Sequence, residues 1–323
     1  MIVLDSVSKQ FPGGVKAMDR VSFEVMEGET LVLLGTSGSG KTTTLKTVNR
    51  LIEPTSGRIF INGKNILEAD PVKLRLNTGY AIQHIGLFPH MTVGENIAVV
   101  PGLKGTPPEE SRKKAAGLLS MVGMIPEEYI DRYPSQLSGG QKQRVGVARA
   151  LAADPSVVLM DEPFGALDPI TREQLQQEFR ELESEIQKTV LFVTHDIFEA
   201  VRMGDRIALM DGGRLQQIAT PAELVENPAN EFVDAFLGSQ RFQLSLLTRN
   251  IGDITEKNSG KETHWTEDSP TVNTHHSLLD ALDIFKKSGK QILPVINKNK
   301  KAGELGKKDL LSAISKVLGE TGE

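Results

Sequence analysis

The chain has 323 residues, a formal net charge of −5 and no cysteine. This length exceeds that of one ordinary compact domain, so we expect two domains. The absence of cysteine excludes a disulfide scaffold, a thiolate metal site and a cysteine nucleophile. A slightly acidic chain also lacks the positive surface of a nucleic-acid-binding protein, so we predict no nucleic-acid partner.

The apolar runs of the chain are short. Val157–Met160 is among the longest of them, whereas a transmembrane helix needs ~20 apolar residues. The first residues, Met1–Asp5, lack the basic and then apolar pattern of a secretion signal. We therefore expect a cytosolic protein, or one held at a membrane only through a partner.

Up to about residue 237, short apolar runs alternate with helical stretches, which is typical of an α/β fold with a parallel sheet. Residues 87–150 lack strand signals and are predicted to form a helical subdomain, with a loop at Pro101–Pro108 and a helix at Pro108–Val122. The predicted strands are Val21–Val25, Thr30–Leu34, Arg58–Ile61, Gly79–Gln83, Val157–Asp161, Thr189–Thr194 and Arg206–Asp211.

A glycine-rich segment lies between a predicted strand and a predicted helix, Thr43–Leu51. It matches the phosphate-loop pattern G-x-x-x-x-G-K-[ST]. Such a loop directs backbone N–H groups at an anion, at the positive end of a helix dipole. Lys41 would contact the β- and γ-phosphates, and the Thr42 hydroxyl would reach Mg²⁺. A chance glycine-rich turn is the alternative, and the flanking strand and helix argue against it. The predicted nucleotide-binding residues here are Gly35, Thr36, Ser37, Gly38, Ser39, Gly40, Lys41, Thr42 and Thr43.

Two acids follow the apolar strand Val157–Met160. Asp161 is predicted to bind Mg²⁺ beside Thr42, and Glu162 lies where it could polarise an attacking water. Two solvated acids at a strand end are the alternative, and the upstream phosphate loop argues against it.

A second glycine pair opens the predicted helix Gln141–Ala153. Ser138, Gly139 and Gly140 precede that helix and would again supply N–H donors for an anion. Both anion sites can act on one phosphate group only if they face each other. That arrangement arises in a head-to-tail dimer.

With these motifs in order, residues 1 to about 237 resemble the ATP-binding subunit of an ABC transporter. The resemblance implies a P-loop cassette with a RecA-like parallel sheet, an antiparallel β subdomain and a helical subdomain. It also implies that Phe11 stacks on adenine, that Gln83 contacts Mg²⁺ and the attacking water, and that His195 is the switch histidine. A core aromatic and a structural histidine are the alternatives for Phe11 and His195. By the same resemblance, Ser138, Gly139, Gly140 and Gln141 cap the ATP of the opposite subunit, and Asp168 lies at the dimer seam.

The implied activity is ATP hydrolysis with ATP and Mg²⁺ as cofactors. The catalytic residues would be Glu162, His195, Lys41 and Gln83, and the metal ligands Thr42, Gln83 and Asp161. The segment that begins with Ser138, Gly139 and Gly140 is the signature of this family. Because the chain holds one phosphate loop and one signature, we expect it to pair with a copy of itself or a sister cassette. Separate permease subunits would complete the transporter. The expected location is the cytoplasmic face of the inner membrane, as a peripheral subunit.

Three stretches resemble the quaternary-amine branch of these importers: Leu45–Leu51, Ile82–Thr92 and Tyr129–Pro134. That branch imports glycine betaine, carnitine, choline or proline betaine as osmoprotectants, delivered by an extracytoplasmic substrate-binding protein. An importer of another small solute, such as an amino acid, remains open. So does a soluble ABC ATPase without a membrane partner.

The composition changes after residue 237. We predict a linker over residues 238–265 and a small α+β regulatory domain over 266–318. A capping box at Ser277–Asp280 starts a helix, and strands are predicted at Ile292–Ile296 and Ala302–Leu305. The segment resembles a single CBS repeat, although such repeats normally pair. Gly306 stands where that family often has Thr or Ser, so a structural or dimerisation role is favoured over nucleotide sensing.

Overall fold

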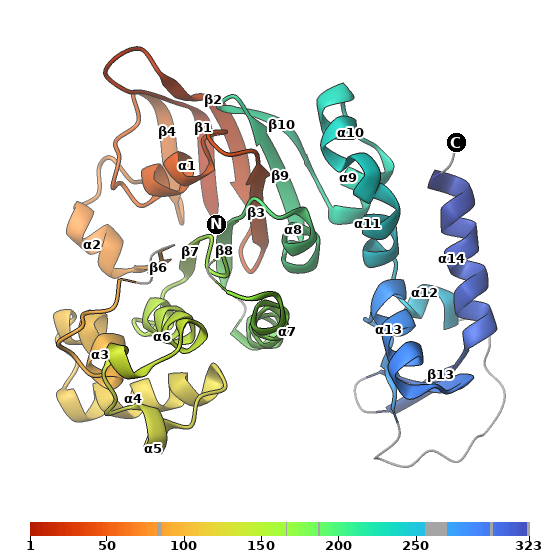
Figure 1. Ribbon diagram of the computed structural model, residues 1–323. Coiled ribbons are helices and arrows are strands. Elements are labelled where there is room, and N and C mark those ends of the chain that lie inside the picture. Colours follow the sequence, from red (N-terminus) through yellow and green to blue (C-terminus); the bar gives the residue numbers. More distant parts are fainter. Residues whose placement is uncertain (83–85, 166, 187, 256–269, 298–299, 322–323) are drawn as a thin grey trace. The chain divides into compact units, whose positions relative to one another are not determined.

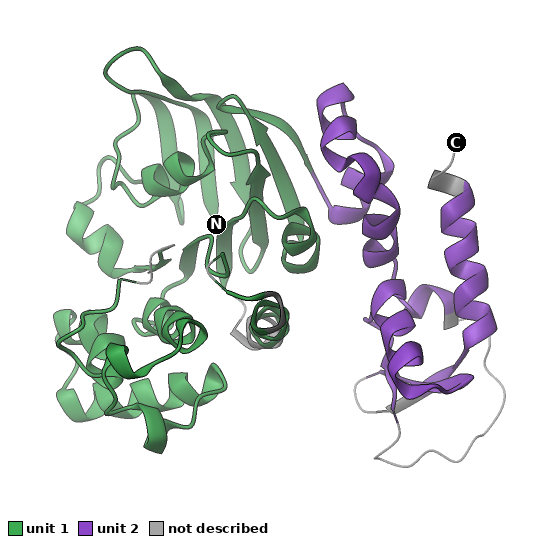
Figure 2. Ribbon diagram, viewed as in Figure 1, with its two compact units in different colours: residues 1–218 green, residues 219–323 purple. Residues whose placement is uncertain are grey.

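The structure is a computed structural model that describes residues 1–82, 86–165, 167–186, 188–255, 270–297 and 300–321. It separates into two compact units, Met1–Ile218 and Ala219–Glu323 (Figure 2). The domain boundary predicted at residue 237 lies inside the second unit. The units are described one at a time below.

A mainly parallel sheet forms the centre of the first unit. Its strand order over the described residues is β10-β9-β3-β8-β7-β6. Strand β3 pairs in parallel with β8 and β9, and β7 pairs in parallel with β6 and β8. Every residue of β3, β7 and β8 is buried, which explains their continuous apolar sequences. The strands are β3 Thr30–Gly35, β6 Thr78–Ala81, β7 Val157–Asp161, β8 Thr189–Val193, β9 Arg206–Asp211 and β10 Arg214–Ala219. The predicted parallel sheet is confirmed.

A second, antiparallel sheet has the order β2-β1-β4-β5 in the described part of the chain. Its apolar side chains share one core with β3, β7 and β8 and with helix α1, Lys41–Val48, through residues such as Leu4, Leu31, Leu45 and Leu159. Strand β1 had not been predicted. The strands are β1 Ile2–Gln10, β2 Lys16–Val25, β4 Ser56–Ile61 and β5 Lys64–Asn65.

Only helices occur in the described residues between β6 and β7 (Figure 1). They are α3 Val93–Leu103, α4 Pro108–Met121, α5 Pro126–Tyr129, the 3₁₀ turn Pro134–Gln136 and α6 Gly139–Leu151. Helix α3 continues through Pro101 to Leu103, so the loop predicted to start at Pro101 begins later. The other helices of this unit are α2 Pro71–Leu76, α7 Pro169–Ile186 and α8 Ile197–Met203.

The second unit begins with helices, continues with a small sheet and ends with a helix. Strand β11 pairs in parallel with β12, and β12 pairs antiparallel with β13. Ser277 and Asp280 form the predicted capping box, and Leu278, Phe285 and Leu293 are buried in the core. The helix after Ser277 and the two predicted strands are present. The predicted linker, in contrast, contains the helices Arg241–Thr248 and Gly252–Thr255, and the short strand Val272–Asn273 was not predicted. The likeness to a CBS repeat stays a prediction. The elements are α9 Pro221–Glu226, α10 Glu231–Leu237, the 3₁₀ turn Gly238–Gln240, α11 Arg241–Thr248, α12 Gly252–Thr255, β11 Val272–Asn273, α13 Leu278–Ser288, β12 Ile292–Asn297, β13 Lys300–Gly306 and α14 Lys307–Thr321.

Among the described residues, no helix has both the length and the apolar character needed to cross a bilayer.

Candidate nucleotide site

The phosphate loop connects β3 to α1, as predicted. Its glycines at 35, 38 and 40 have φ angles of +152°, +81° and +101°. A Cβ on Gly35 would lie 2.1 Å from the Met210 carbonyl oxygen, and one on Gly40 would lie 2.3 Å from that of Ala17. Both positions therefore require glycine for lack of space as well as for backbone conformation. Thr36 and Ser37 are exposed in the loop, Ser39 is buried, and Thr43 is half-buried in the first turn of α1.

Lys41 folds back onto this loop. Its Nζ donates hydrogen bonds of 2.8 Å to the carbonyl oxygens of Gly35 and Thr36, and one of 3.4 Å to Ser39 Oγ. The residue is only 6% exposed. Burial lowers the pKa of its ammonium group, and the charges of Glu162 and Asp161 oppose that shift.

The other end of the loop contacts the acidic strand. Thr42 Oγ1 donates a 3.0 Å hydrogen bond to Asp161 Oδ1, at the end of β7. Burial raises the pKa of Asp161, and the hydrogen bond from Thr42 and the charges of Lys46 and Lys41 partly oppose this. A hydroxyl and a carboxylate oxygen are ligands that Mg²⁺ prefers. These two residues therefore fit the predicted metal site.

Glu162 and His195 meet beside this pair. The two side chains lie 3.2 Å apart, between His195 Nδ1 and Glu162 Oε2. Glu162 directly follows β7, has a φ of +46°, and its N–H donates to the Val193 carbonyl at 3.0 Å. His195 follows β8 and its side chain is 62% exposed. The carboxyl ends of β3, β7 and β8 thus bring Lys41, Asp161, Glu162 and His195 to one edge of the sheet.

The signature segment opens α6. Ser138 Oγ accepts a hydrogen bond from the Gln141 N–H at 3.3 Å, and Gln141 Oε1 accepts one from the Ser138 N–H at 2.9 Å. Gln141 Nε2 also donates to the hydroxyl of Tyr129 at 3.1 Å. Ser138 and Gly139 are exposed. Within the described part of this chain, no hydrogen bond joins these residues to the phosphate loop.

Asp168, Phe11 and Gln83 are the remaining predicted residues. Asp168 is exposed, and its Oδ1 accepts the Thr171 N–H at 3.1 Å in the first turn of α7. Phe11 is half-buried after β1, with Lys9 Nζ 5.3 Å from its ring centroid. Gln83, predicted as both a metal ligand and a catalytic residue, lies outside the described residues.

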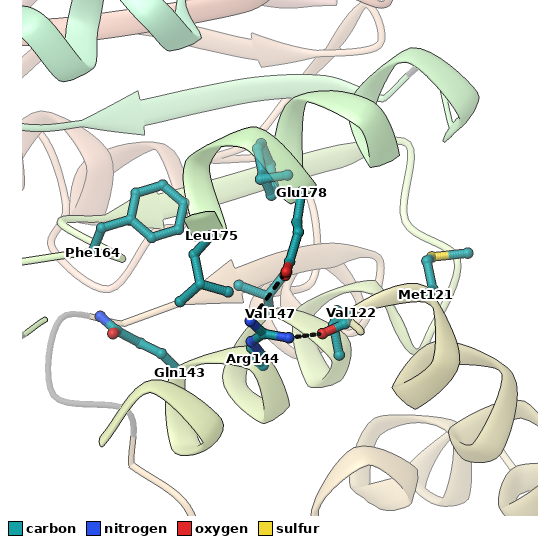
Figure 3. A pocket seen from close by; sticks show the side chains of 9 residues that line it. Met121, Val122, Gln143, Arg144, Val147, Phe164, Leu175 and Glu178 are labelled. Atoms are coloured by element: carbon teal, nitrogen blue, oxygen red, sulfur yellow. Dashed lines mark hydrogen bonds and ion pairs between the residues drawn. The ribbon is translucent and has the colours of Figure 1, made fainter. Parts of the chain in front are cut away.

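Sequence reasoning missed a set of contacts that join α6 to α7. Figure 3 shows a mainly apolar pocket crossed by Arg144, which forms a 3.1 Å ion pair with Glu178 and donates to the Val122 carbonyl at 3.1 Å. Gln143, also on α6, donates to the carbonyl of Pro163, the residue after Glu162. Helix α6 is thereby tied both to α7 and to the turn beside the acidic pair. The polar residues directly after the signature were the only sequence signal for these contacts.

Comparisons with known proteins agree with this geometry. A family profile described as "ABC transporter" matches residues 18–165. The chain is 55% identical over 241 residues to the glycine betaine/carnitine/choline transport ATP-binding protein OpuCA of Bacillus subtilis, covering 75% of this chain and 63% of that protein. It is 44% identical over 313 residues to the glycine betaine uptake system ATP-binding protein YehX of Escherichia coli, covering 96% of this chain and 99% of that protein.

A solved structure shares the fold. The dimeric, post-hydrolysis state of the ATP-binding cassette MJ0796, bound to ADP and Pi, has a TM-score of 0.62 and 35% sequence identity. The match covers 68% of this chain and 98% of that one. Together with YehX, of which the chain covers 99%, this likeness shows that the chain belongs to the family of ABC transporter ATP-binding proteins.

Proposed function

We propose that this chain binds and hydrolyses ATP and drives an importer for quaternary-amine osmoprotectants. The observation that carries the ATPase assignment is the convergence of two pairs at one sheet edge. Thr42 contacts Asp161 at 3.0 Å, and His195 contacts Glu162 at 3.2 Å. Both pairs lie beside a loop whose glycines permit close approach of an anion.

The loop and Lys41 would hold the phosphates. The N–H groups at the start of α1 face an anion at the positive end of the helix dipole. Thr42 and Asp161 would hold Mg²⁺, together with Gln83. When bound, Mg²⁺ supplies positive charge that neutralises the phosphate oxygens.

Glu162 is suited to act as the general base. Its carboxylate lies 3.2 Å from His195 Nδ1 and is mostly shielded from solvent, with 18% of its side chain exposed. His195 would orient that carboxylate and contact the transferred phosphoryl group. Catalysis of this type depends mainly on positioning and electrostatics.

We further propose that two cassettes act together. Ser138, Gly139, Gly140 and Gln141 of one subunit would complete the site of the other, with Asp168 at the seam and Phe11 against adenine. In such a dimer the signature would contact a nucleotide, whereas among the described residues of one chain no hydrogen bond joins it to the phosphate loop. Residues 1–237 would form the cassette and 266–318 a regulatory or dimerisation domain. The stretch predicted as a linker between them carries helices α11 and α12.

The substrate assignment rests on the relatives named above, whose names specify glycine betaine, carnitine and choline. The chain spans 63% of the length of the first of them, so the transported solute and the partners remain proposals. We propose permease subunits in the membrane, a substrate-binding protein outside it, and this chain bound peripherally at the cytoplasmic face.

Hydrolysis is tested first on the purified chain. We expect Mg²⁺-dependent release of phosphate from ATP, and loss of that release in Glu162→Gln. A chain that binds ATP but releases no phosphate in any nucleotide or metal condition would contradict the ATPase assignment.

Transport is tested in cells that lack the gene. We expect radiolabelled glycine betaine, choline or carnitine uptake at high osmolarity to be lost and then restored by the wild-type gene, but not by the Glu162→Gln gene. Uptake of labelled amino acids serves as the comparison. If only amino-acid uptake changes, the chain serves a different importer. If no uptake changes, the reading as a soluble ATPase gains support.

A further inference from the structure

Two short segments carry the paired side chains of the candidate site. Glu162 begins the turn that follows β7, and the Gly165 N–H donates to its carbonyl at 3.1 Å. The turn continues to Leu167, whose N–H donates to the Phe164 carbonyl at 3.2 Å. His195 lies in the loop between β8 and α8. The 3.2 Å contact between Glu162 Oε2 and His195 Nδ1 therefore depends on how this turn and this loop are held relative to each other.

One side chain of α7 contacts both segments. Arg172 Nη2 donates a 3.0 Å hydrogen bond to the carbonyl of Leu167, in the Glu162 turn. Arg172 Nη1 forms a 3.7 Å ion pair with Oδ2 of Asp196, the residue directly after His195. Arginine suits this place because its guanidinium carries several donors in one rigid plane, whereas lysine has a single nitrogen.

Asp196 passes this restraint to the backbone around His195. Its Oδ1 accepts the N–H groups of Phe198 at 2.9 Å and Glu199 at 3.3 Å, which caps the start of α8. Its own N–H donates to Thr194 Oγ1 at 3.0 Å. One carboxylate oxygen thus holds the loop to α8, and the other holds it to Arg172 on α7.

Folding stability does not account for this arrangement. The side chains of Arg172 and Asp196 are 31% and 34% exposed, and ion pairs that are this exposed contribute little to stability. Arg172 Nε is also buried without a hydrogen-bond partner in the described part of the chain, which costs free energy. What the guanidinium does supply is a connection between the two segments.

We propose that Arg172 is a positioning residue for ATP hydrolysis: it holds the Glu162 turn and the His195 loop together, so that the carboxylate and the imidazole stay in contact. The inference rests on the proposed ATPase function. It adds a residue that acts through Leu167 and Asp196 rather than on the nucleotide.

The first test is Arg172→Ala in the full-length chain. We expect kcat to fall about tenfold to a hundredfold, since small misplacements of reacting groups have effects of that size. KM for ATP should change less than threefold, because the phosphate loop is untouched. A rise in KM with an unchanged kcat would contradict a role in positioning the catalytic pair.

Arg206→Ala is the matched control. The Arg206 side chain is 32% exposed, and it too contacts a carbonyl and a carboxylate, those of Glu24 at 3.4 Å and Glu29 at 3.1 Å. It opens β9, which runs parallel to β3, so it lies at the end of the sheet away from the phosphate loop. We expect Arg206→Ala to lower the thermal midpoint at least as much as Arg172→Ala, because Glu29 is the more buried partner, yet to leave kcat near the wild-type value.

Asp196→Asn tests whether Arg172 acts through the His195 loop. Asparagine is as good a helix cap as aspartate, so the variant keeps the start of α8 and loses only the charge that Arg172 contacts. We expect a smaller loss of kcat than in Arg172→Ala, and no additional loss when the two substitutions are combined, because both remove the same contact. Losses that multiply in the double variant would show that Arg172 does not act through Asp196.

A further readout follows the imidazole itself. In protein labelled at histidine Cε1, the His195 signal is identified by its loss in His195→Ala. We expect Arg172→Ala and Asp196→Asn to shift or broaden that signal and Arg206→Ala to leave it in place. Asp196→Asn provides this comparison even if Arg172→Ala does not fold.

The imidazole signal does not require turnover, so the positioning role and the proposed ATPase function can fail separately. An unmoved His195 signal in Arg172→Ala and Asp196→Asn, or equal kcat losses in Arg172→Ala and Arg206→Ala, would overturn the positioning role.

Discussion

The hydroxyl of Thr42 donates a 3.0 Å hydrogen bond to the carboxylate of Asp161, a residue 119 positions later in the chain. The contact joins the first turn of α1 to the end of β7. It places a hydroxyl and a carboxylate oxygen, the two proposed ligands of Mg²⁺, side by side at the edge of the sheet. It also keeps an acid in a buried position, where 3% of the residue is exposed.

Replacing Asp161 with Asn should stabilise the protein when metal and nucleotide are absent. Burial raises the pKa of Asp161 in the folded state. The stability that a protonated Asp161 contributes is therefore full below its unfolded pKa and is lost as the pH rises through its folded pKa. At neutral pH in EDTA we expect a higher thermal midpoint for Asp161→Asn, by roughly 2–4 °C for each kcal/mol of relief.

Thermal unfolding followed by circular dichroism over a pH series checks this. The advantage of the variant should shrink in acid, where the wild-type carboxyl is also neutral. A midpoint below that of the wild-type at neutral pH would contradict the prediction. Hydrolysis by the variant should be lost, because the amide is a weak ligand for Mg²⁺.

Glu162→Gln should abolish turnover while ATP still binds. The amide keeps the shape of the side chain and loses the basic oxygen, and general bases contribute typically 10²–10⁴-fold to rate. Dimers should accumulate with ATP and be visible by size-exclusion chromatography. The exposed Glu27→Gln is the control and should behave as wild-type. Near-normal phosphate release by Glu162→Gln would remove this residue from the mechanism.

Lys41→Ala should weaken the binding of a non-hydrolysable ATP analogue. The substitution deletes a charged donor directed at the phosphates, and hydrogen bonds to charged groups are worth about 1.5–3 kcal/mol, or roughly 10- to 150-fold in affinity. Titration calorimetry measures the change, with the exposed Lys64→Ala as control. Unchanged affinity would show that the phosphate loop is misassigned.

Gly40→Ala should be more damaging than Gly38→Ala. Both glycines have positive φ angles, of +101° and +81°, so both substitutions carry backbone strain of about 1–2 kcal/mol. Only at Gly40 would the new Cβ collide with a backbone atom, the Ala17 carbonyl oxygen, whereas at Gly38 it meets nothing within 4 Å among the described residues. Denaturant unfolding of the two variants should separate the cost of the steric collision from the cost of the backbone strain. Equal losses would mean that the loop can move away from Ala17.

Two truncations test where the chain divides. A chain ending at residue 240 removes α11 but keeps α9, although Arg241 donates to the Val225 carbonyl at 3.0 Å and pairs with Asp234 at 2.9 Å. A chain ending at residue 218 removes the second compact unit whole. Because every nucleotide motif from Phe11 to His195 lies before residue 218, we expect both to retain nucleotide binding. The longer one should aggregate more readily, as measured by light scattering.

If the chain ending at residue 240 is instead the more soluble and stable of the two, the boundary predicted at residue 237 is the better one. If neither form folds, the nucleotide site depends on the second unit.

The parts of the fold that the sequence predicts well are those where one physical cause dominates. A parallel strand buried on both faces must be apolar throughout, so Val157–Asp161 and Arg206–Asp211 are found to the residue. Strand β1 was missed because its polar residues interrupt the apolar pattern. Strand β10, Arg214–Ala219, was missed because most of its residues are only half-buried. Pro101 was expected in a loop, yet it lies within the last turn of α3.

In the candidate site, too, local sequence patterns predict some residues and miss the contacts that depend on tertiary packing. The phosphate loop and the acidic strand are local patterns, so they can be recognised without tertiary information. Contacts such as Arg144 with Glu178 and Gln176 with Glu199 join residues far apart in sequence. Glu199 in particular occupies a helix position where an acid is ordinarily solvated, and only the packing of α7 against it shows that it is buried.

Ser138 and Gln141 cap the start of α6 reciprocally, and the described residues of the folded chain place no steric limit on the side chain at Gly139. Ser138 and Gln141 satisfy each other, and a Cβ on Gly139 would meet nothing within 4 Å in the described part of the chain. A bulky residue at position 139 is therefore compatible with the folded monomer. It would intrude only where another molecule approaches the helix terminus. A substitution at this single position can thus separate folding from assembly. The variant cassette would fold as a monomer but would not form the dimer.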